Sequence, residues 1–279
     1  MIELLNSFLV IRMSNSSENI IIGIDASRCC YRGASRHILG LINEFNYHKK
    51  YKIKRIILWS IPSILNQIKY SENLVKIKTY PTNCPLFIKI LWQFLILPLK
   101  AKKYKVDVMF NPDAGTFCWF QPSVSMSRDM LPFDEIELKK VSLFSYDRLR
   151  LEALKRISIW NLSRCNVALF LNDFARKEIS KKAKLKTTMI APHGIPDGFF
   201  KKRKSNKFPI SQGKIQCTYV STLGPYKNQW HVVRAIKLLR DKLDYDIKLK
   251  LIGIKKGNLY QQLMDAVNFN DPKKEFIEI

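Results

Sequence analysis

Short apolar runs alternate with helical segments along most of this chain, and that alternation constrains the fold more than any other feature. The first run, 19–25, is rich in isoleucine, which is typical of a strand buried on both faces. A polar loop follows, and residues 34–46 then place their apolar side chains on one helical face. Further strand-like runs are 55–60, 75–80, 106–112, 123–129, 167–172 and 187–193, with helical segments at 85–104, 141–164 and 173–183. The sequence therefore predicts an α/β fold with a mostly parallel, doubly wound sheet.

A basic, polar segment that contains Pro209 and Gly213 separates this block from a second one. The second block repeats the alternation on a smaller scale, with expected strands at 216–222, 248–254 and 275–279 and expected helices at 228–243 and 257–268. We therefore expect a complete Rossmann-like domain over 1–200, a linker over 201–214 and a second Rossmann-like domain over 215–279. The second domain is small enough that we expect it to be incomplete.

The chain is strongly basic, with 48 Lys and Arg against 23 Asp and Glu and a formal net charge of +25. Such a charge favours phosphorylated substrates, an anionic membrane surface or nucleic acid as partners. A compositional origin stays open as well, because the basic residues are spread along the whole chain. The sequence has neither a basic-aromatic module nor zinc-ligand spacing, so nucleic acid is the least favoured of these partners.

Several features bear on where the protein resides. Its six cysteines show no CxxC pair and no regular spacing, which is typical of core residues in a reduced, cytoplasmic protein. Residues 1–12 lack the basic start and the cleavage site of a signal peptide, so they form a short leader or Met13 is the true start.

Residues 85–99 are the most apolar stretch, but about 15 residues are too few to span a bilayer. They form a buried helix or an interfacial helix whose cationic edge is Lys100, Lys102, Lys103 and Lys105.

In a doubly wound fold the ligand site lies beyond the carboxyl ends of the strands, and polar residues follow several of the predicted strands. Gly33 and Arg36 follow the first strand, where a glycine lets a ligand approach the backbone and an arginine pairs with phosphate. Arg128 and Asp129 end the run at 123–129, where they suit the hydroxyl groups of an acceptor or an internal ion pair. His193 precedes the linker. We expect it either to contact a ligand or to form a hydrogen bond within the hinge between the two domains.

The loop STLGPYKN, 221–228, leads from a predicted strand directly into a predicted helix. We expect Asn228 to cap that helix, so that the Lys227 ammonium and the helix dipole act together on a diphosphate. The alternative is a solvated lysine in a turn. The sequence contains no HExxH, GxSxG or Walker motif, which leaves hydrolase and P-loop functions without support.

Taken together, these segments resemble glycosyltransferase family 4, retaining enzymes of the GT-B fold that use nucleotide-sugars to build polysaccharides. The resemblance rests on IGIDASRCCYRGASRHILGLI, SMSRDMLPFDEIELKK, IAPHGIPDGFF and YVSTLGPYKNQWHVVRAI. It implies transfer of a hexose from a nucleotide-sugar donor to a lipid-linked or saccharide acceptor at the inner face of a membrane. We expect no metal or other cofactor, because Lys227 and the helix dipole can stabilise the leaving group and no carboxylate pair marks a metal site. The apolar and basic residues of 85–105 predict that this cytoplasmic protein associates peripherally with an anionic membrane surface.

The resemblance also assigns roles to the predicted site residues. It implies that Gly33 lies near the donor phosphates and that Lys227 binds the donor diphosphate. Thr222 stands where many members have a second arginine for the diphosphate. Arg128 and Asp129 stand where the family often has a His-Asp pair beside the reacting sugar. Arg128 departs from that pattern, because a guanidinium group cannot act as a general base.

The paired glutamates of the family, spaced E-x7-E, would lie beyond Ile279. We therefore expect a truncated enzyme that shows no measurable sugar transfer and at most weak nucleotide affinity. The missing glutamates favour a non-catalytic remnant or scaffold as the alternative function. A basic nucleic-acid-binding protein is favoured only by the net charge of +25.

Overall fold

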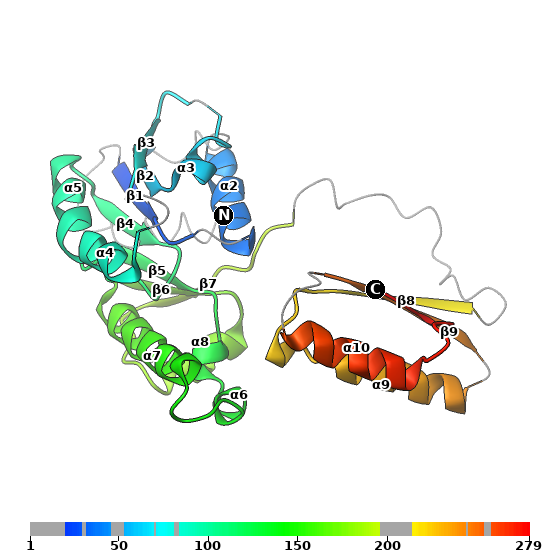
Figure 1. The fold of residues 1–279 in the computed structure, drawn as a ribbon. Coiled ribbons are helices and arrows are strands. Elements are labelled where there is room, and N and C mark those ends of the chain that lie inside the picture. The colour runs from blue at the N-terminus through cyan, green and yellow to red at the C-terminus, as the bar shows by residue number, and fades with distance from the viewer. Residues whose placement is uncertain are drawn as a thin grey trace. The chain divides into compact units, whose positions relative to one another are not determined.

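The computed structural model describes residues 20–29, 32–45, 53–69, 71–80, 84–195, 214–243, 245–253 and 258–279. The chain divides into two compact units, unit 1 over Met1–Phe200 and unit 2 over Lys201–Ile279 (Figure 1). The expected leader, 1–12, and nearly all of the expected linker, 201–213, lie outside the described residues.

Unit 1 is built on a seven-stranded sheet in which all neighbouring strands are parallel, in the order β3-β2-β1-β4-β5-β6-β7. The chain moves outward from β1 to β3 and then returns to the other side of β1 at β4. This reversal is the switch point of a doubly wound fold, so the predicted fold class is confirmed. The strands are β1 (Ile20–Ala26), β2 (Ile53–Ser60), β3 (Leu74–Lys78), β4 (Val108–Asn111), β5 (Ser123–Ser127), β6 (Val167–Phe170) and β7 (Thr188–Ile190).

The central strand β1 shows why these apolar runs form the middle of a layered structure. Ile22 and Ile24 are fully buried in the same layer of the core. Gly23 faces the opposite layer, where an added Cβ atom would lie 3.0 Å from the Trp59 ring and 3.0 Å from the Val106 side chain. A larger residue at this position would displace Trp59, so the glycine permits the close packing of β1 against β2 and its cover.

Helices cover both faces of this sheet, as the alternation of apolar strands with helical segments in the sequence predicts. Helices α2 (Arg32–Phe45) and α3 (Pro62–Leu65) pack on the layer that contains Ile22 and Ile24. The other layer is covered by a continuous helical segment through Trp92 and Leu97. That segment consists of α4 (Leu86–Leu91), the π-helical turn η1 (Trp92–Ile96) and α5 (Leu97–Lys103). The remaining helices of unit 1 are η2 (Leu131–Phe133), α6 (Glu135–Lys139), α7 (Tyr146–Arg164) and α8 (Asp173–Ser180).

Unit 2 contains a three-stranded parallel sheet in the order β10-β9-β8. Its helices pack on this sheet around Val233, Leu249 and Leu263. The Asp271 carboxylate accepts the backbone N–H groups of Glu275, Phe276 and Ile277 at 2.8 to 3.0 Å, which holds the chain in place as it enters the last strand. The elements are β8 (Lys214–Val220), η4 (Pro225–Lys227), α9 (Gln229–Lys242), β9 (Asp246–Ile252), α10 (Asn258–Asn270) and β10 (Ile277–Glu278).

Candidate functional site

Polar side chains of unit 1 gather where its parallel strands end, at the edge that binds ligands in doubly wound folds. One group, which we call the switch-point network, consists of Asp25, Ser27, Gln93 and Thr116. Asp25 is the penultimate residue of β1, and Thr116 lies in the loop after the neighbouring strand β4. Gln93 comes from the π-helical turn η1. The network therefore joins the two central strands to the helical segment that covers them.

Asp25 is the centre of this network and is only 4% exposed. Its Oδ1 atom accepts hydrogen bonds from the backbone N–H of Ser27 at 3.2 Å and from the Ser27 hydroxyl at 2.6 Å. Its Oδ2 atom accepts hydrogen bonds from Gln93 Nε2 at 2.7 Å and from Thr116 Oγ1 at 2.9 Å. Burial raises the pKa of the Asp25 carboxyl group, while the hydrogen bonds from Ser27, Thr116 and Gln93 act to lower it. With this many protein donors on one buried carboxyl group, the network positions the loops around it.

Further bonds connect the loops at this edge. The Tyr80 hydroxyl, beyond the end of β3, donates to the Ser27 carbonyl at 2.7 Å. The Arg28 guanidinium donates to the Gly115 carbonyl, and the Gly115 N–H donates to Asp113 Oδ1 at 2.9 Å. The loops after β1, β3 and β4 are thus held to one another, so the backbone at the switch point is well supported.

A second group, which we call the histidine–arginine cluster, consists of His37, Arg128, His193 and Cys29. The His37 ring packs edge-on against the His193 ring, with centroids 4.8 Å apart and planes inclined at 61°. Arg128 Nη2 lies 3.9 Å from the Cys29 sulfur atom. The cluster joins α2, the segment after β5 and the segment after β7. It brings together Arg128 and His193, two residues that the sequence predicts as site residues.

The electrostatics of this cluster keep both imidazoles neutral. Burial, followed by the charges of Arg128 and His193, lowers the pKa of His37 to about 3. The pKa of His193 is lowered first by partial burial and then by the charge of Arg128. His37 Nε2 and Arg128 Nε are buried, and neither has a hydrogen-bond partner among the described residues. A guanidinium donor beside neutral imidazoles suits a ligand that carries hydroxyl groups or negative charge.

The other predicted residues of unit 1 lie beside this cluster rather than in it. Asp129 is exposed, and its Oδ1 atom accepts the backbone N–H of Leu131 at 3.0 Å, an Asx turn that leads into η2. No ion pair between Arg128 and Asp129 occurs within the described part of the chain, so the internal ion pair that the sequence allowed is not formed.

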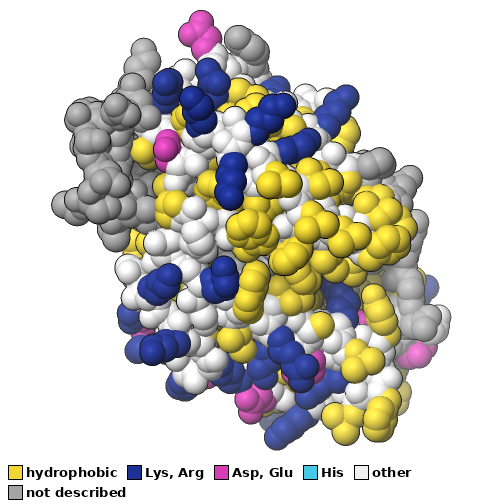
Figure 2. Space-filling view, turned by 90° about the vertical axis from the view of Figure 1, so that its left-hand side faces the viewer, with side chains coloured by type: hydrophobic (Ala, Val, Ile, Leu, Met, Phe, Trp, Pro, Cys, Tyr) yellow, Lys and Arg dark blue, Asp and Glu magenta, His cyan; other side chains and the backbone are white. Residues whose placement is uncertain are grey.

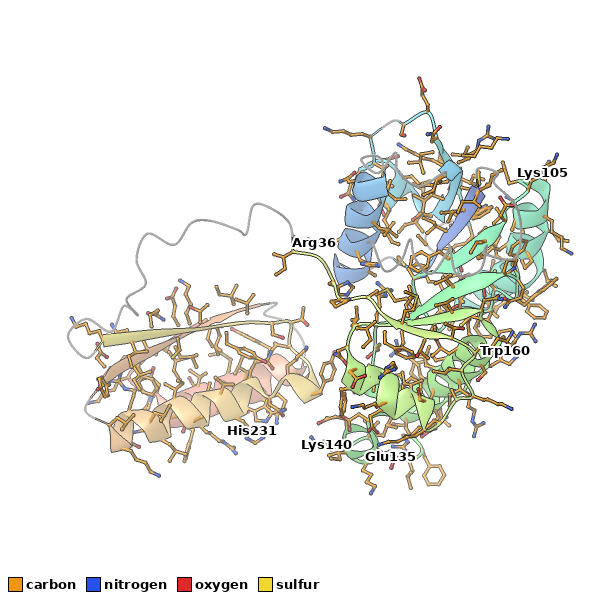
Figure 3. All side chains as sticks on the ribbon, turned by 180° about the vertical axis from the view of Figure 1, so that it is seen from behind. Arg36, Lys105, Glu135, Lys140, Trp160 and His231 are labelled. Atoms are coloured by element: carbon orange, nitrogen blue, oxygen red, sulfur yellow. The ribbon has the colours of Figure 1, made fainter. Side chains whose placement is uncertain are left out.

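Gly33 and Arg36 both belong to α2. The prediction that Gly33 lies in a loop is wrong, because the helix already begins at Arg32. Nothing lies within 4 Å of the position that a Cβ atom on Gly33 would take, so close packing does not require a glycine there. Arg36 is exposed near the amino-terminal end of the helix (Figure 3).

Sequence reasoning missed four of the side chains that organise these groups, although signals for them were present. Asp25 ends an otherwise apolar strand, and Gln93 is an amide inside the most apolar stretch of the chain. His37 directly follows Arg36 at the start of a helix. Thr116 stands in the loop after a strand, as Arg128 does, but a single threonine there is too common to single out.

In unit 2 the predicted donor-binding residues flank the turn between β8 and α9. The prediction that the Asn228 side chain caps α9 is wrong: Asn228 adopts the left-handed conformation, with φ of 54°, and its side chain makes no capping bond. The Lys227 carbonyl accepts the Tyr219 hydroxyl at 2.8 Å, and the Thr222 carbonyl accepts Gln229 Nε2 at 2.9 Å. These bonds fix the backbone of the turn. The Lys227 ammonium lies 4.9 Å from the centre of the Tyr226 ring.

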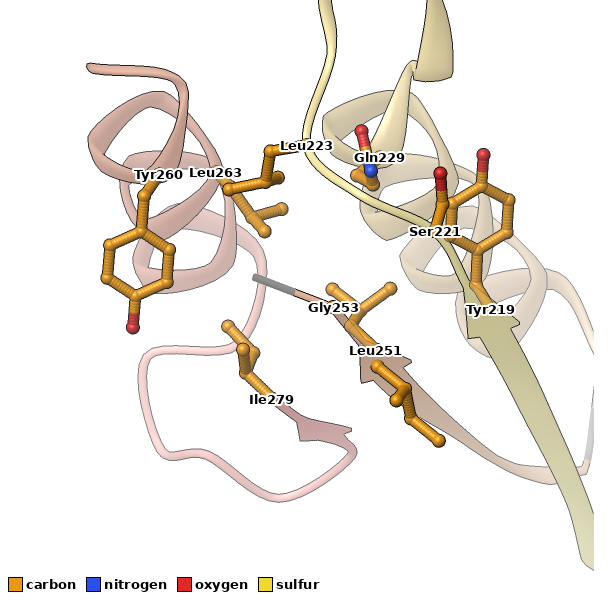
Figure 4. A pocket seen from close by; sticks show the side chains of 10 residues that line it. Tyr219, Ser221, Leu223, Gln229, Leu251, Gly253, Tyr260, Leu263 and Ile279 are labelled. Atoms are coloured by element: carbon orange, nitrogen blue, oxygen red, sulfur yellow. The ribbon is translucent and has the colours of Figure 1, made fainter. Parts of the chain in front are cut away.

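A small pocket lies beside this turn, at the carboxyl ends of the strands of unit 2 (Figure 4). Tyr219, Leu251 and Leu263 contribute to its largely apolar lining. Its cavity volume of about 20 Å³ has room for about one water molecule. Gly253 and Ser221 both line the pocket, and their backbones lie so close that a Cβ atom at position 253 would be 2.1 Å from the Ser221 carbonyl oxygen. The pocket is therefore a packing feature beside the turn and does not have the size of a nucleoside.

Within the described ranges, no group of three or more His, Cys, Asp and Glu side chains is arranged to hold a metal ion. Among the described residues, Cys84, Cys118, Cys165 and Cys217 are free thiols, and Cys118 and Cys165 are buried. In the same part of the chain, no helix combines the length and the apolar character needed to cross a membrane.

Comparison with solved structures identifies the fold. Sucrose-phosphate synthase from Thermosynechococcus elongatus superposes with a TM-score of 0.63 at 12% identity, over 94% of this chain and 71% of that one. HepE from Anabaena, in complex with UDP and glucose, gives a TM-score of 0.59 at 12% identity, over 94% and 68% of the two chains. The lipopolysaccharide outer core galactosyltransferase WaaB gives 0.55 at 12% identity, over 92% and 66%.

No family model matches the sequence, and no curated protein matches it. The structural likeness is nevertheless consistent across both units. The chain has the fold of the GT-B glycosyltransferases, and the seven-stranded sheet of unit 1 is Rossmann-like.

Proposed function

We propose that the chain carries side chains of an enzyme that transfers a hexose from a nucleotide-sugar to a lipid-linked or saccharide acceptor in polysaccharide biosynthesis. The observation that carries this proposal is the histidine–arginine cluster at the carboxyl edge of a GT-B unit. There Arg128 provides a fixed positive charge, and His37 and His193 provide neutral nitrogen atoms. The bound UDP and glucose in HepE and the galactosyltransferase activity named for WaaB support the same class of ligand.

In this proposal Arg128, with Asp129 holding the turn beside it, binds the reacting sugar. His37 and His193 accept hydrogen bonds from hydroxyl groups of the sugar or the acceptor, and Arg36 extends the contact surface. During transfer, the bond from the anomeric carbon to the diphosphate breaks and a bond to the acceptor oxygen forms. The acceptor hydroxyl passes its proton to an oxygen of the departing nucleoside diphosphate, which then leaves.

Negative charge develops on the departing diphosphate, and its stabilisation is the main electrostatic demand of the reaction. We assign this role to Lys227, assisted by Thr222 and by the amino-terminal end of α9, whose dipole is positive there. We place Gly33, in the first turn of α2, near the donor phosphates, because no other atom lies within 4 Å of the position that a Cβ atom would take there. No metal ion is part of the proposal. We propose that the protein is cytoplasmic and meets a lipid-linked acceptor at the inner face of the membrane.

Calorimetric titration with a panel of UDP-, GDP- and ADP-hexoses tests the donor site. We expect one donor class to bind, and Lys227→Ala to weaken that binding about tenfold or more, because a hydrogen bond to a charged group contributes about 1.5 to 3 kcal/mol. Lys242→Ala removes the same charge from the other end of α9 and is the matched control. Equal affinities of the two variants would exclude Lys227 from the site, and an absence of binding to the whole panel would contradict the proposed function.

Two further assays, of nucleoside diphosphate release and of DNA binding, separate the proposed enzyme from the two alternative functions. Donor binding without release of nucleoside diphosphate in the presence of lipid-linked acceptors would favour a non-catalytic scaffold. Binding to DNA that weakens steeply with salt, with no affinity for nucleotide-sugars, would favour a nucleic-acid-binding protein.

A further inference from the structure

The helical segment α4–η1–α5 exposes a continuous apolar surface, which we call the apolar stripe. It consists of Phe87, Leu91, Phe94, Leu95, Ile96 and Leu99, with exposed fractions of 61%, 50%, 45%, 52%, 43% and 63%. Figure 2 shows hydrophobic side chains gathered on this side of the molecule. Single exposed apolar residues are ordinary, but a contiguous group of this kind marks an interaction surface.

The stripe is not the core-facing side of its helix. The inner side carries Trp92, Leu97 and Ala101, which are buried against the sheet of unit 1. The segment is therefore apolar on both its inner and its outer side. A soluble surface helix is normally polar on the outside, so the outer side requires a second apolar environment.

The π-helical turn η1 creates this two-sided arrangement. It turns two successive residues, Trp92 and Gln93, into the core. The three residues that follow, Phe94 to Ile96, are all exposed. Gln93 then donates to Asp25 in the switch-point network at 2.7 Å. The apolar stripe is thus attached directly to the polar edge at which we place the sugar site.

Positive charge lies at one end of the stripe. Lys100, Lys102 and Lys103 occupy the last turn of α5, and Lys105 follows the helix (Figure 3). The Lys102 ammonium lies 5.8 Å from the centre of the Trp119 ring, and the Trp119 indole N–H donates to the Phe94 carbonyl at 2.7 Å. Lysine side chains beside an aromatic ring and an apolar surface are the residue types that favour the boundary between lipid tails and headgroups.

We propose that the apolar stripe and these lysines form a docking surface for an anionic lipid bilayer, with the helix lying in the plane of the interface. Apolar side chains then enter the boundary of the acyl chains, and the ammonium groups meet lipid phosphates. A second copy of the chain fits this surface less well. Two copies would each carry the formal net charge of +25, which opposes their association, and would leave these lysines without an anionic partner. The evidence for this docking surface is independent of the proposed function. Only the idea that the membrane also supplies a lipid-linked acceptor rests on that function.

Vesicle flotation tests the proposal without any nucleotide-sugar, so it succeeds or fails independently of the donor assay. The full chain should float with vesicles of equal phosphatidylglycerol and phosphatidylcholine, and only weakly with phosphatidylcholine alone. The double variant Leu95→Ser/Leu99→Ser should lose at least about tenfold in partitioning, because both side chains leave the interface. Leu238→Ser/Phe269→Ser is the matched control, since it removes exposed apolar side chains from unit 2. Circular dichroism checks that both variants are folded.

The charge contribution has its own pair of variants. Lys100→Gln/Lys102→Gln/Lys103→Gln should weaken binding to anionic vesicles more than Lys54→Gln/Lys69→Gln/Lys184→Gln, which removes the same net charge elsewhere in unit 1. Failure of the wild-type chain to float with anionic vesicles would overturn the proposal, as would equal flotation of the two triple variants. A concentration-dependent dimer in sedimentation that Leu95→Ser/Leu99→Ser abolishes, without vesicle binding, would assign the surface to a second copy instead.

Discussion

The imidazole rings of His37 and His193 meet edge to face, with their centroids 4.8 Å apart. His37 lies on α2, which follows the first strand of unit 1, and His193 follows β7, its last strand. The contact therefore closes the carboxyl edge of the sheet between elements that are far apart in the sequence. Burial first, and then the charge of Arg128, lowers the pKa of both rings.

The first prediction concerns stability and pH. In the folded protein the pKa of His37 is about 3, below the ordinary value of 6.5. Between these values the unfolded chain binds a proton that the folded chain does not, so stability falls as the pH falls. One proton corresponds to about 1.4 kcal/mol per pH unit, so wild type should lose about 2 kcal/mol more than His37→Gln between pH 6.5 and pH 5. Urea unfolding at both pH values measures this difference.

His231→Gln is the control for this experiment, because it removes an exposed imidazole from unit 2 (Figure 3). It should keep the pH dependence of wild type. Parallel stability curves for wild type and His37→Gln would show that His37 is protonated equally in the folded and unfolded chains, against this prediction.

The second prediction isolates the charge of Arg128. Replacing it with glutamine removes a positive charge that disfavours protonation of His37 and His193. The pKa values of both imidazoles should therefore rise, while burial still keeps that of His37 below the ordinary range. NMR titration of the ring protons measures both values. Arg150→Gln, an exposed substitution on α7, should leave them unchanged, and a fall of either pKa in Arg128→Gln would refute the electrostatic account.

The third prediction concerns the switch-point network. Asp25→Ala removes the acceptor of the Ser27 and Thr116 hydroxyl groups and the closer of the two acceptors of Gln93 Nε2, which keeps only Ser27 Oγ at 3.2 Å. Each unpaired buried donor costs about 1 to 3 kcal/mol, so we expect a loss of at least about 3 kcal/mol in the free energy of unfolding. Asp129→Ala removes an exposed carboxylate with one backbone bond and should cost about 1 kcal/mol or less. Equal losses in denaturant unfolding would mean that the network does not support the fold as we describe.

Local pattern was sufficient for the secondary structure and the topology class. The isoleucine run of β1, the one-sided helix α2 and the repeated alternation after them predicted the strands and the longer helices of the structure and their parallel order, but not the short helices α3, η2 and α6. The spacing of apolar residues predicts directly that a central strand is buried on both faces and a helix on one face. The same spacing does not reveal turn geometry, and for this reason Asn228 was wrongly expected to cap α9 and Gly33 to lie in a loop.

The sequence by itself determined the α/β class, the position of Arg128 and His193 after strands, and the apolar character of the α4–η1–α5 segment. Tertiary structure decided what these residues contact. His37 became a site residue because α2 carries it to the segment after β7, and Asp25 became buried because Gln93 and Thr116 reach it from other elements. The outer side of α5 became a surface because only one side of a helix can pack on a sheet. Such contacts depend on distances between remote segments, which no local pattern contains.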